Sequence, residues 1–228
     1  MRILLLNERD LPPPLAGGVE VHQEEVASRL RSRHGIETTV LCSGYPGGAA
    51  DEERRGVRFV RLGNRISYYA LVPGRARAEL AGGGYDLVIE NLCKLMFCSA
   101  LYLPRVPKLG LVHHLFGFSA FRQVAPPIAA AVLATEAMLP LLYRRWPFVC
   151  VSPSSAEDLV RRGLPRASIR VIPNGLDHAR YSPGPPEQVE RDLVVFVGRL
   201  EHYKGVDLLI DAWREVQRRL DEQAAQRG

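Results

Sequence analysis

The stretch of sequence that decides the fold is LVVFVGRLEHYKGVD, residues 193–207. Its five consecutive apolar residues end at Gly198, a pattern typical of a strand buried on both faces of a parallel sheet. Apolar residues then recur with a helical period over residues 206–220. The turn between carries Arg199 and Lys204 where the amino end of the helix favours an anion. The pattern predicts a phosphate site, although a turn with two solvated cations fits the spacing equally well.

The same order of strand, turn and helix recurs through the preceding chain. Alternation of this kind is typical of an α/β fold, a doubly wound Rossmann-like parallel sheet. The predicted strands are residues 3–6, 37–41, 57–62, 85–90, 106–112, 148–151 and 169–172. The predicted helices are residues 19–30, 68–80, 95–103, 124–143 and 154–163, and residues 43–56 are expected to form a loop.

The length of 228 residues is enough for two modest domains. A polar, proline-rich run at residues 181–191 predicts a linker between a first domain, residues 1–180, and a second, residues 192–228. One strand and one helix cannot bury a core. We therefore expect residues 192–228 to be the incomplete beginning of a second Rossmann-like domain.

A formal net charge of +5 implies an electropositive surface, which suits a phosphorylated ligand or an anionic membrane. The arginines occur in scattered pairs without interleaved aromatic residues, so no nucleic-acid partner is expected. Cys42, Cys93, Cys98 and Cys150 lack the spacing of a zinc site and the density of a disulfide scaffold, which favours reduced core residues. The apolar run at residues 3–6 is too short for a signal peptide, so we expect a cytoplasmic protein.

The most apolar segment is residues 124–143. Three prolines and the central Glu136 favour a buried or interfacial helix over a membrane span. Two arginines and a tryptophan follow it directly. A peripheral contact through residues 124–146 with the inner face of a membrane therefore stays open as an alternative to simple burial.

Three short motifs occur along the chain in an order that is typical of one enzyme family. They are the Gly17-Gly18 pair, VSPS at residues 151–154 with IPNGLD at 172–177, and VGRL at 197–200 with KG at 204–205. Together they resemble the retaining family-4 glycosyltransferases, whose GT-B fold has two facing Rossmann-like domains. The resemblance runs along the whole chain, and its last two pieces are the specific ones.

The resemblance implies a site for the diphosphate of a nucleotide-sugar donor. Arg199 and Lys204 would hold the diphosphate, and the backbone at Gly17 and Gly18 would approach it closely. Glycine suits such an approach because it has no Cβ.

The resemblance also implies a contact with the transferred sugar. His113, at the end of the strand before the central crossing helix, would be the catalytic residue that faces the sugar. His114 and Asn174 are further candidates for contact with the acceptor or the sugar. Alternatively, either histidine could be a purely structural residue that is hydrogen-bonded in the core or lies on the surface.

No metal and no cofactor is expected besides the nucleotide-sugar co-substrate, because the sequence has no Asp-x-Asp pair to bridge a diphosphate through a metal. Family enzymes retain the anomeric configuration by front-face attack, so no carboxylate nucleophile is assigned. Asp86, Glu90 and Glu136 are predicted to be structural.

In one respect the chain departs from the family pattern. Family members carry two glutamates seven residues apart downstream of the lysine–glycine motif, and this sequence ends before that region. We therefore expect a truncated form with little or no activity alone. The parent function would be sugar transfer from a nucleotide-sugar to a carbohydrate or lipid-linked acceptor, such as a cell-envelope glycan. The alternatives are a non-catalytic acceptor- or partner-binding module and a nucleotide-sugar epimerase on the same fold.

Overall fold

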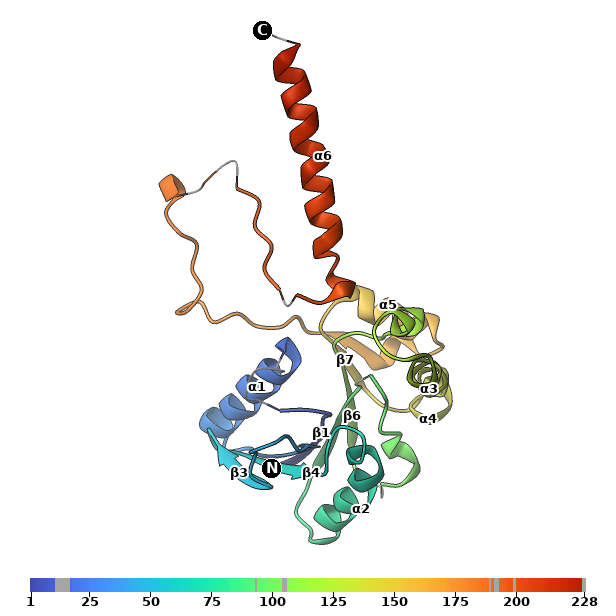
Figure 1. The fold of residues 1–228 in the computed structure, drawn as a ribbon. Coiled ribbons are helices and arrows are strands. Elements are labelled where there is room, and N and C mark those ends of the chain that lie inside the picture. The colour runs from blue at the N-terminus through green and yellow to red at the C-terminus, as the bar shows by residue number, and fades with distance from the viewer. Residues whose placement is uncertain are drawn as a thin grey trace. The chain divides into compact units, whose positions relative to one another are not determined.

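The computed structural model describes residues 1–10, 17–92, 94–103, 106–188, 190, 193–198 and 200–226. The chain divides into two compact units, Met1–Gly175 and Leu176–Gly228. The first unit contains the β-sheet of the described residues (Figure 1).

The sheet has eight strands within the described residues, in the order β3-β4-β2-β1-β5-β6-β7-β8. Every pairing is parallel except that of the edge strand β3 with β4. The strands are β1 (Arg2–Leu6), β2 (Glu37–Ser43), β3 (Asp51–Arg54), β4 (Val57–Leu62), β5 (Leu87–Asn91), β6 (Lys108–Val112), β7 (Phe148–Cys150) and β8 (Ile169–Val171). This topology confirms the predicted doubly wound α/β class.

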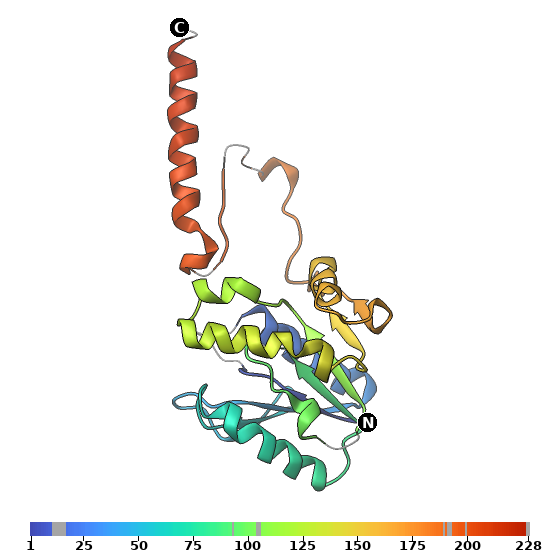
Figure 2. The same cartoon turned by 90° about the vertical axis from the view of Figure 1, so that its right-hand side faces the viewer.

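Strand β1 shows why helices cover both faces of the sheet. Its side chains alternate between the faces, as in any strand, yet nearly all of them are apolar and buried. Leu5 joins the core cluster under α1 (Gly18–His34), whereas Leu4 joins the cluster under α2 (Tyr68–Ala81). Figures 1 and 2 show these two helices on opposite sides of the sheet.

The second half of the sheet has its own core. Tyr143, Phe148 and Leu159 are fully buried there. The remaining helices of the first unit are α3 (Pro126–Ala137), α4 (Leu139–Leu142), α5 (Pro153–Arg161) and the 3-10 turns η1 (Ser99–Leu101), η2 (Gly117–Arg122) and η3 (Arg166–Ser168).

The expected loop at residues 43–56 contains a strand, β3. All four of its residues are charged, so it has none of the apolar alternation by which strands are predicted. Ion pairs take the place of apolar packing: Asp51 binds Arg58, and Glu52 binds Arg61 of the neighbouring strand. The loop prediction was therefore wrong for these four residues.

The predicted helix at residues 95–103 is also wrong, since only η1 is helical there. Cys98 adopts a left-handed backbone conformation with φ 51°, which stops a helix. The backbone N–H groups of Phe97 and Ser99 donate to the carboxylate of Glu90 instead of to helical carbonyls.

Two helix boundaries differ from the prediction. The single helix expected at 124–143 divides into α3 and α4 at Met138. Pro140 has no N–H to donate to the carbonyl four residues earlier, which explains the break. Helix α5 begins at Pro153, one residue before the predicted start, and is capped by Ser152, whose hydroxyl accepts from the N–H of Ser155.

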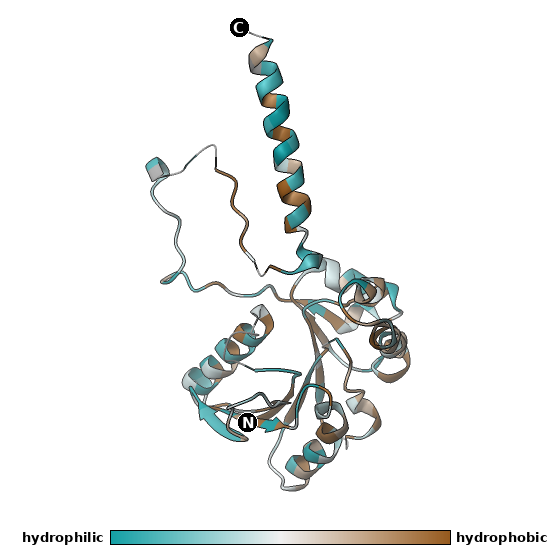
Figure 3. Ribbon diagram, in the orientation of Figure 1, coloured by the Kyte–Doolittle hydropathy of each residue, from teal (hydrophilic) through white to brown (hydrophobic). Residues whose placement is uncertain are grey.

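The second unit contains η4 (Pro186–Gln188), η5 (His202–Lys204) and α6 (Val206–Ala225). Helix α6 is present as predicted, and Figure 3 shows apolar and polar residues mixed along it. Residues 193–197 do not form the predicted buried strand; Val197 is 89% exposed. A strand needs a neighbour for its backbone groups, and the described part of this unit has no other strand.

Candidate active site

The order of strands reverses between β1 and β5, because the chain continues from β1 toward β2 and from β5 toward β6. Ligands of open α/β sheets bind at the carboxyl ends of the strands beside such a reversal. Asn7 follows β1 directly and Asn91 ends β5. The Asn91 amide donates to Oδ1 of Asn7 over 2.7 Å and so links the two strand ends.

Helix α1 begins at this edge with the glycine pair. Gly17 is its N-cap, and the Gly17 N–H donates to Oε2 of Glu20 over 2.6 Å. The other oxygen of Glu20 pairs with Arg9 at 3.2 Å. A Cβ on Gly17 would lie 3.3 Å from the Glu20 carboxylate, whereas one on Gly18 would meet nothing within 4 Å. Glu20 therefore fixes the start of α1, and no other atom lies close to the position of a Cβ on Gly18.

His113 follows β6 at the same edge. Its ring contacts the ring of His22, from α1, edge to face, with centroids 5.1 Å apart and planes at 79°. Its backbone carbonyl accepts from the hydroxyl of Ser155, from α5, over 3.0 Å. Nε2 of His113 and Nδ1 of His22 are buried, and neither has a hydrogen-bond partner among the described residues.

Burial favours the neutral form of both imidazoles. Burial first, and then the neighbouring His22 and His114, lower the pKa of His113 to about 4. Burial also lowers the pKa of His22. A neutral imidazole offers one donor and one acceptor nitrogen, which suits a hydroxyl group of a ligand.

A carboxylate of α3 holds the segment that follows His113 through hydrogen bonds. Glu136 is almost fully buried, and its carboxylate accepts from the N–H groups of Phe116 (2.7 Å) and Gly117 (3.0 Å). Arg162 pairs with the same carboxylate at 3.0 Å. The buried charge is thereby satisfied, and Glu136 has the structural role that was predicted for it.

Glu90 anchors the segment after β5 in a similar way. The hydroxyl groups of Tyr143 and Ser99 and the N–H groups of Phe97 and Ser99 donate to its buried carboxylate. Burial raises the pKa of Glu90, and these hydrogen bonds oppose the effect. Glu90 therefore has a structural role. Asp86 has one too, since its carboxylate accepts from the backbone N–H of Arg2.

The structure brings four of the predicted site residues to one edge of the first unit: Gly17, Gly18, His113 and His114. His22 lies one helical turn after Gly18 and contacts His113, so the start of α1 and the end of β6 adjoin. The exposed His114 ring lies 4.4 Å from that of Phe116.

The other predicted site residues are not gathered there. Asn174 is exposed in the coil that follows β8. Lys204 ends η5 in the second unit, directly before Gly205, which has a left-handed φ of 65°. Arg199 lies outside the described residues. The pairing of arginine and lysine on a diphosphate thus stays a prediction.

Sequence reasoning missed His22 and Glu20. Both belong to the GGVEVH run, and a signal was present: His22 is four residues after Gly18, which places the two on one face of a helix. Its partner His113 is distant in sequence, so the contact could not be predicted. Among the described residues, no group of three or more histidine, cysteine, aspartate or glutamate side chains is arranged to hold a metal.

The doubly wound sheet, with the glycine-capped helix and the half-buried His113 at one carboxyl edge, defines the first unit as a Rossmann-like domain. Residues 16–180 match the family Glycosyltransferase Family 4. The chain belongs to this family, as its sequence motifs predicted.

Characterised relatives agree with this assignment. One component of human phosphatidylinositol N-acetylglucosaminyltransferase is 27% identical over 215 residues, which cover 86% of this chain and 41% of the relative. Alpha-maltose-1-phosphate synthase of Mycobacterium tuberculosis is 26% identical over 247 aligned residues, 93% of this chain and 57% of the relative. The chain spans about half the length of the curated relatives it matches.

Solved structures with the same fold are GT-B enzymes. Sucrose-phosphate synthase from Thermosynechococcus elongatus has a TM-score of 0.68 at 20% identity, over 94% of this chain and 60% of that one. Anabaena HepE in complex with UDP and glucose has a TM-score of 0.53 at 18% identity, over 81% and 47%. These likenesses confirm the fold class.

Proposed function

We propose that this protein takes part in sugar transfer from a nucleotide-sugar donor to a carbohydrate or lipid-linked acceptor, with retention of anomeric configuration. The observation that carries the proposal is the half-buried, neutral His113 beside the glycine-capped start of α1, in a chain of glycosyltransferase family 4. Relatives named for glycosyl transfer and a structural neighbour that binds UDP and glucose support it.

In this proposal the donor diphosphate lies at the start of α1. Breaking the anomeric bond builds negative charge on the leaving phosphate, and fixed N–H groups and cations stabilise that charge. Gly17 and Gly18 are proposed to offer backbone N–H groups to the diphosphate, and Arg199 and Lys204 are proposed as cations that bind it. No metal is assigned, and the nucleotide-sugar is the co-substrate.

His113 acts on the sugar. Because its imidazole is neutral at physiological pH, it can donate to or accept from a sugar hydroxyl without adding a cation beside the oxocarbenium-like transition state. The acceptor hydroxyl attacks the anomeric carbon from the face that the diphosphate leaves, and the departing phosphate oxygen takes its proton. His114 and Asn174 are proposed as contacts to the sugar or acceptor.

A transfer assay tests the proposal. Full-length protein is incubated with a panel of nucleotide-sugars and candidate acceptors, and the glycoside is measured. We expect His113→Ala to lower kcat by about 100-fold or more, the scale of losing one transition-state hydrogen bond. His34→Ala, which removes an exposed histidine from the other end of α1, is the control and should keep wild-type activity. Equal activity of the two variants would remove His113 from the mechanism.

We also propose that the protein binds peripherally to anionic membranes through residues 118–145. None of the described helices has the length and apolarity to cross a bilayer. Yet every exposed residue of α3 is Pro, Ile or Ala, and Leu141 continues the surface at 78% exposure. A surface helix normally presents polar residues to water. Such a face suits the boundary between lipid headgroups and acyl chains.

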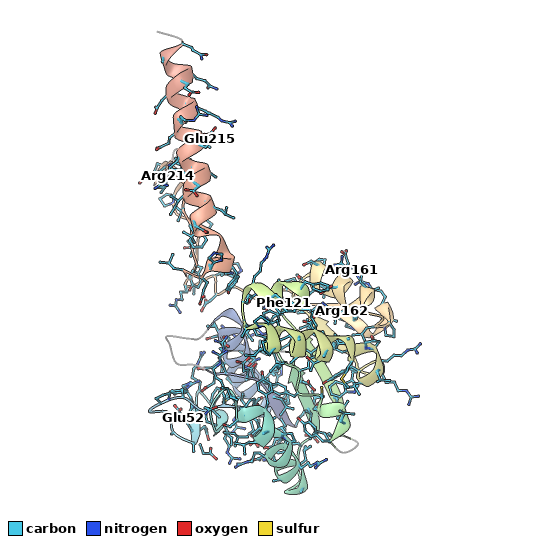
Figure 4. All side chains as sticks on the ribbon, turned by 45° about the vertical axis from the view of Figure 1, so that its right-hand side comes forward. Glu52, Phe121, Arg161, Arg162, Arg214 and Glu215 are labelled. Atoms are coloured by element: carbon cyan, nitrogen blue, oxygen red, sulfur yellow. The ribbon has the colours of Figure 1, made fainter. Side chains whose placement is uncertain are left out.

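The neighbouring residues fit the same surface. Phe118 is 81% exposed and Phe121 is 46% exposed on η2, which packs beside α3 (Figure 4). Arg122, Arg144 and Arg145 are exposed, and no ion pair of theirs is found within the described residues. The one acid of this segment, Glu136, is buried and paired. Each arginine near an anionic leaflet contributes about 1 kcal/mol.

Vesicle sedimentation tests the membrane proposal. We expect binding to vesicles of equal phosphatidylcholine and phosphatidylglycerol that weakens with added salt, and none to pure phosphatidylcholine. Phe118→Ser with Phe121→Ser should abolish binding, whereas Ile66→Ser, which removes an 88%-exposed apolar side chain elsewhere, should not. Sedimentation of both variants like wild type would reject this surface. A concentration-dependent dimer without lipid binding would assign it to a second copy.

A further inference from the structure

His22 is absent from the roles assigned so far, yet its surroundings are unusual. It lies one turn inside α1, after the glycine pair, and its ring is partly buried against His113. Each of the two rings has one buried nitrogen without a hydrogen-bond partner among the described residues. Buried polar atoms are paired in most sites, so two adjacent orphans at the carboxyl edge of the sheet point to a functional site.

We infer that His22 is a positioning residue for sugar transfer: its ring sets the plane of the His113 imidazole and connects that imidazole to the glycine-capped start of α1. The inference rests on the proposed function, because it gives His22 a role through the residue that faces the sugar. It adds a second imidazole, contributed by another element, to the site.

The contacts of His113 explain why its ring needs a neighbour. The Ser155 hydroxyl fixes the backbone of His113 by binding its carbonyl, but this bond does not restrain the side chain. The torsion that turns an imidazole ring is broad, so packing has to select the ring plane. Within the described part of the chain, the aromatic ring that contacts the His113 ring is that of His22, edge to face.

The two neighbouring rings, His22 and His113, also affect each other's protonation. The titratable neighbours that act on His113 among the described residues are His22, from α1, and His114, from its own segment. Protonation of one ring of the pair opposes protonation of the other, because two cations at this separation repel. His22 therefore helps to keep His113 neutral, in addition to fixing its plane.

The first test needs no activity. In the 228-residue chain with ¹⁵N-labelled histidine, the His113 ring nitrogens are followed by NMR against pH. Removal of the His22 ring in His22→Ala admits water and removes the repulsion, so the His113 titration should move up toward its ordinary value near 6.5. His22→Phe keeps the packing but removes the repulsion, so the His113 titration should move up less in this variant than in His22→Ala, and His34→Ala is the matched control. An unmoved His113 titration in His22→Ala would overturn the inference.

The second test uses transfer by the full-length protein. We expect His22→Ala to lower kcat by about 10- to 100-fold, the range for a misplaced group, and to move the acid limb of the kcat/KM profile to higher pH. His22→Phe should recover much of kcat, with a smaller shift of the acid limb than in His22→Ala. Equal loss in both variants with matching melting temperatures, or a wild-type limb in His22→Ala, would overturn the role. If wild type transfers no sugar while the NMR coupling is present, the proposed function fails and the coupling of the two rings stands.

Discussion

At the residue scale, partial burial changes the protonation of His113. Its pKa falls to about 4 because the folded protein removes it from water and places His22 and His114 beside it. In the unfolded chain the pKa is near 6.5. The folded state therefore disfavours a proton that the unfolded chain binds readily.

This difference predicts a pH dependence of stability. Between about pH 6.5 and pH 4 the unfolded chain gains a proton at His113 that the folded chain rejects, so the free energy of unfolding falls as pH falls, by up to about 3 kcal/mol. Replacement by glutamine in His113→Gln should remove that part of the decline. Urea unfolding at a series of pH values measures it, with His34→Gln as the control for loss of a histidine. If the two variants decline alike, burial of His113 does not carry the effect.

The positions of candidate site residues were predictable from the sequence only where a short motif or an apolar run marked them. His113 ends an apolar run that can be read directly, and the structure places it at the carboxyl edge of β6. His22 and Glu20 derive their roles from partners that the fold brings close, His113 and Arg9. A pattern of apolar and polar residues contains no information about such tertiary pairs.

At the element scale, the strands that position the site depend on close packing between neighbours. Gly110 lies in the middle of β6, three residues before His113. A Cβ built there would lie 2.3 Å from the ring of Phe148 on β7, and Phe148 is itself fully buried. The aromatic ring occupies the space that any other residue at position 110 would need.

Gly110→Ala should therefore destabilise the first unit, by about 1–3 kcal/mol or more, the cost of overpacking a core. Gly74→Ala is the matched control, since its Cβ would meet nothing within 4 Å and alanine is favoured inside α2; it should stabilise by about 0.5–1 kcal/mol. Thermal unfolding of the two variants measures the difference. A Gly110→Ala protein as stable as wild type would contradict the tight β6–β7 packing.

Elements were predictable where the hydrophobic period was strong and unpredictable where other forces decide. The buried parallel strands and the helices α2 and α6 follow from their apolar patterns, whereas α1 is a helix as predicted but buries mainly polar residues, and its Val21 and Val26 are exposed. Strand β3 is held by ion pairs, and the segment at residues 95–103 is drawn out of a helix by the buried Glu90 carboxylate. Residues 193–197 have the pattern of a strand without a neighbouring strand in the described part of their unit.

At the scale of the whole molecule, each of the two units carries residues that are proposed for sugar transfer. The first carries the glycine-capped α1 and the neutral His113, and the second carries Lys204 before α6. Exposed cations alone hold a diphosphate weakly and with strong salt dependence. We therefore expect efficient transfer to need further contacts to the diphosphate.

The most direct test of sugar transfer compares two products in one reaction. Full-length protein is incubated with the nucleotide-sugar and acceptor that it turns over best, and free nucleoside diphosphate and new glycoside are measured together. We predict that the two products accumulate in equal amounts with retained anomeric configuration, and that both fall in His113→Ala but not in His34→Ala. Conversion of the sugar while it stays attached to the nucleotide, or no turnover across the panel, would contradict it.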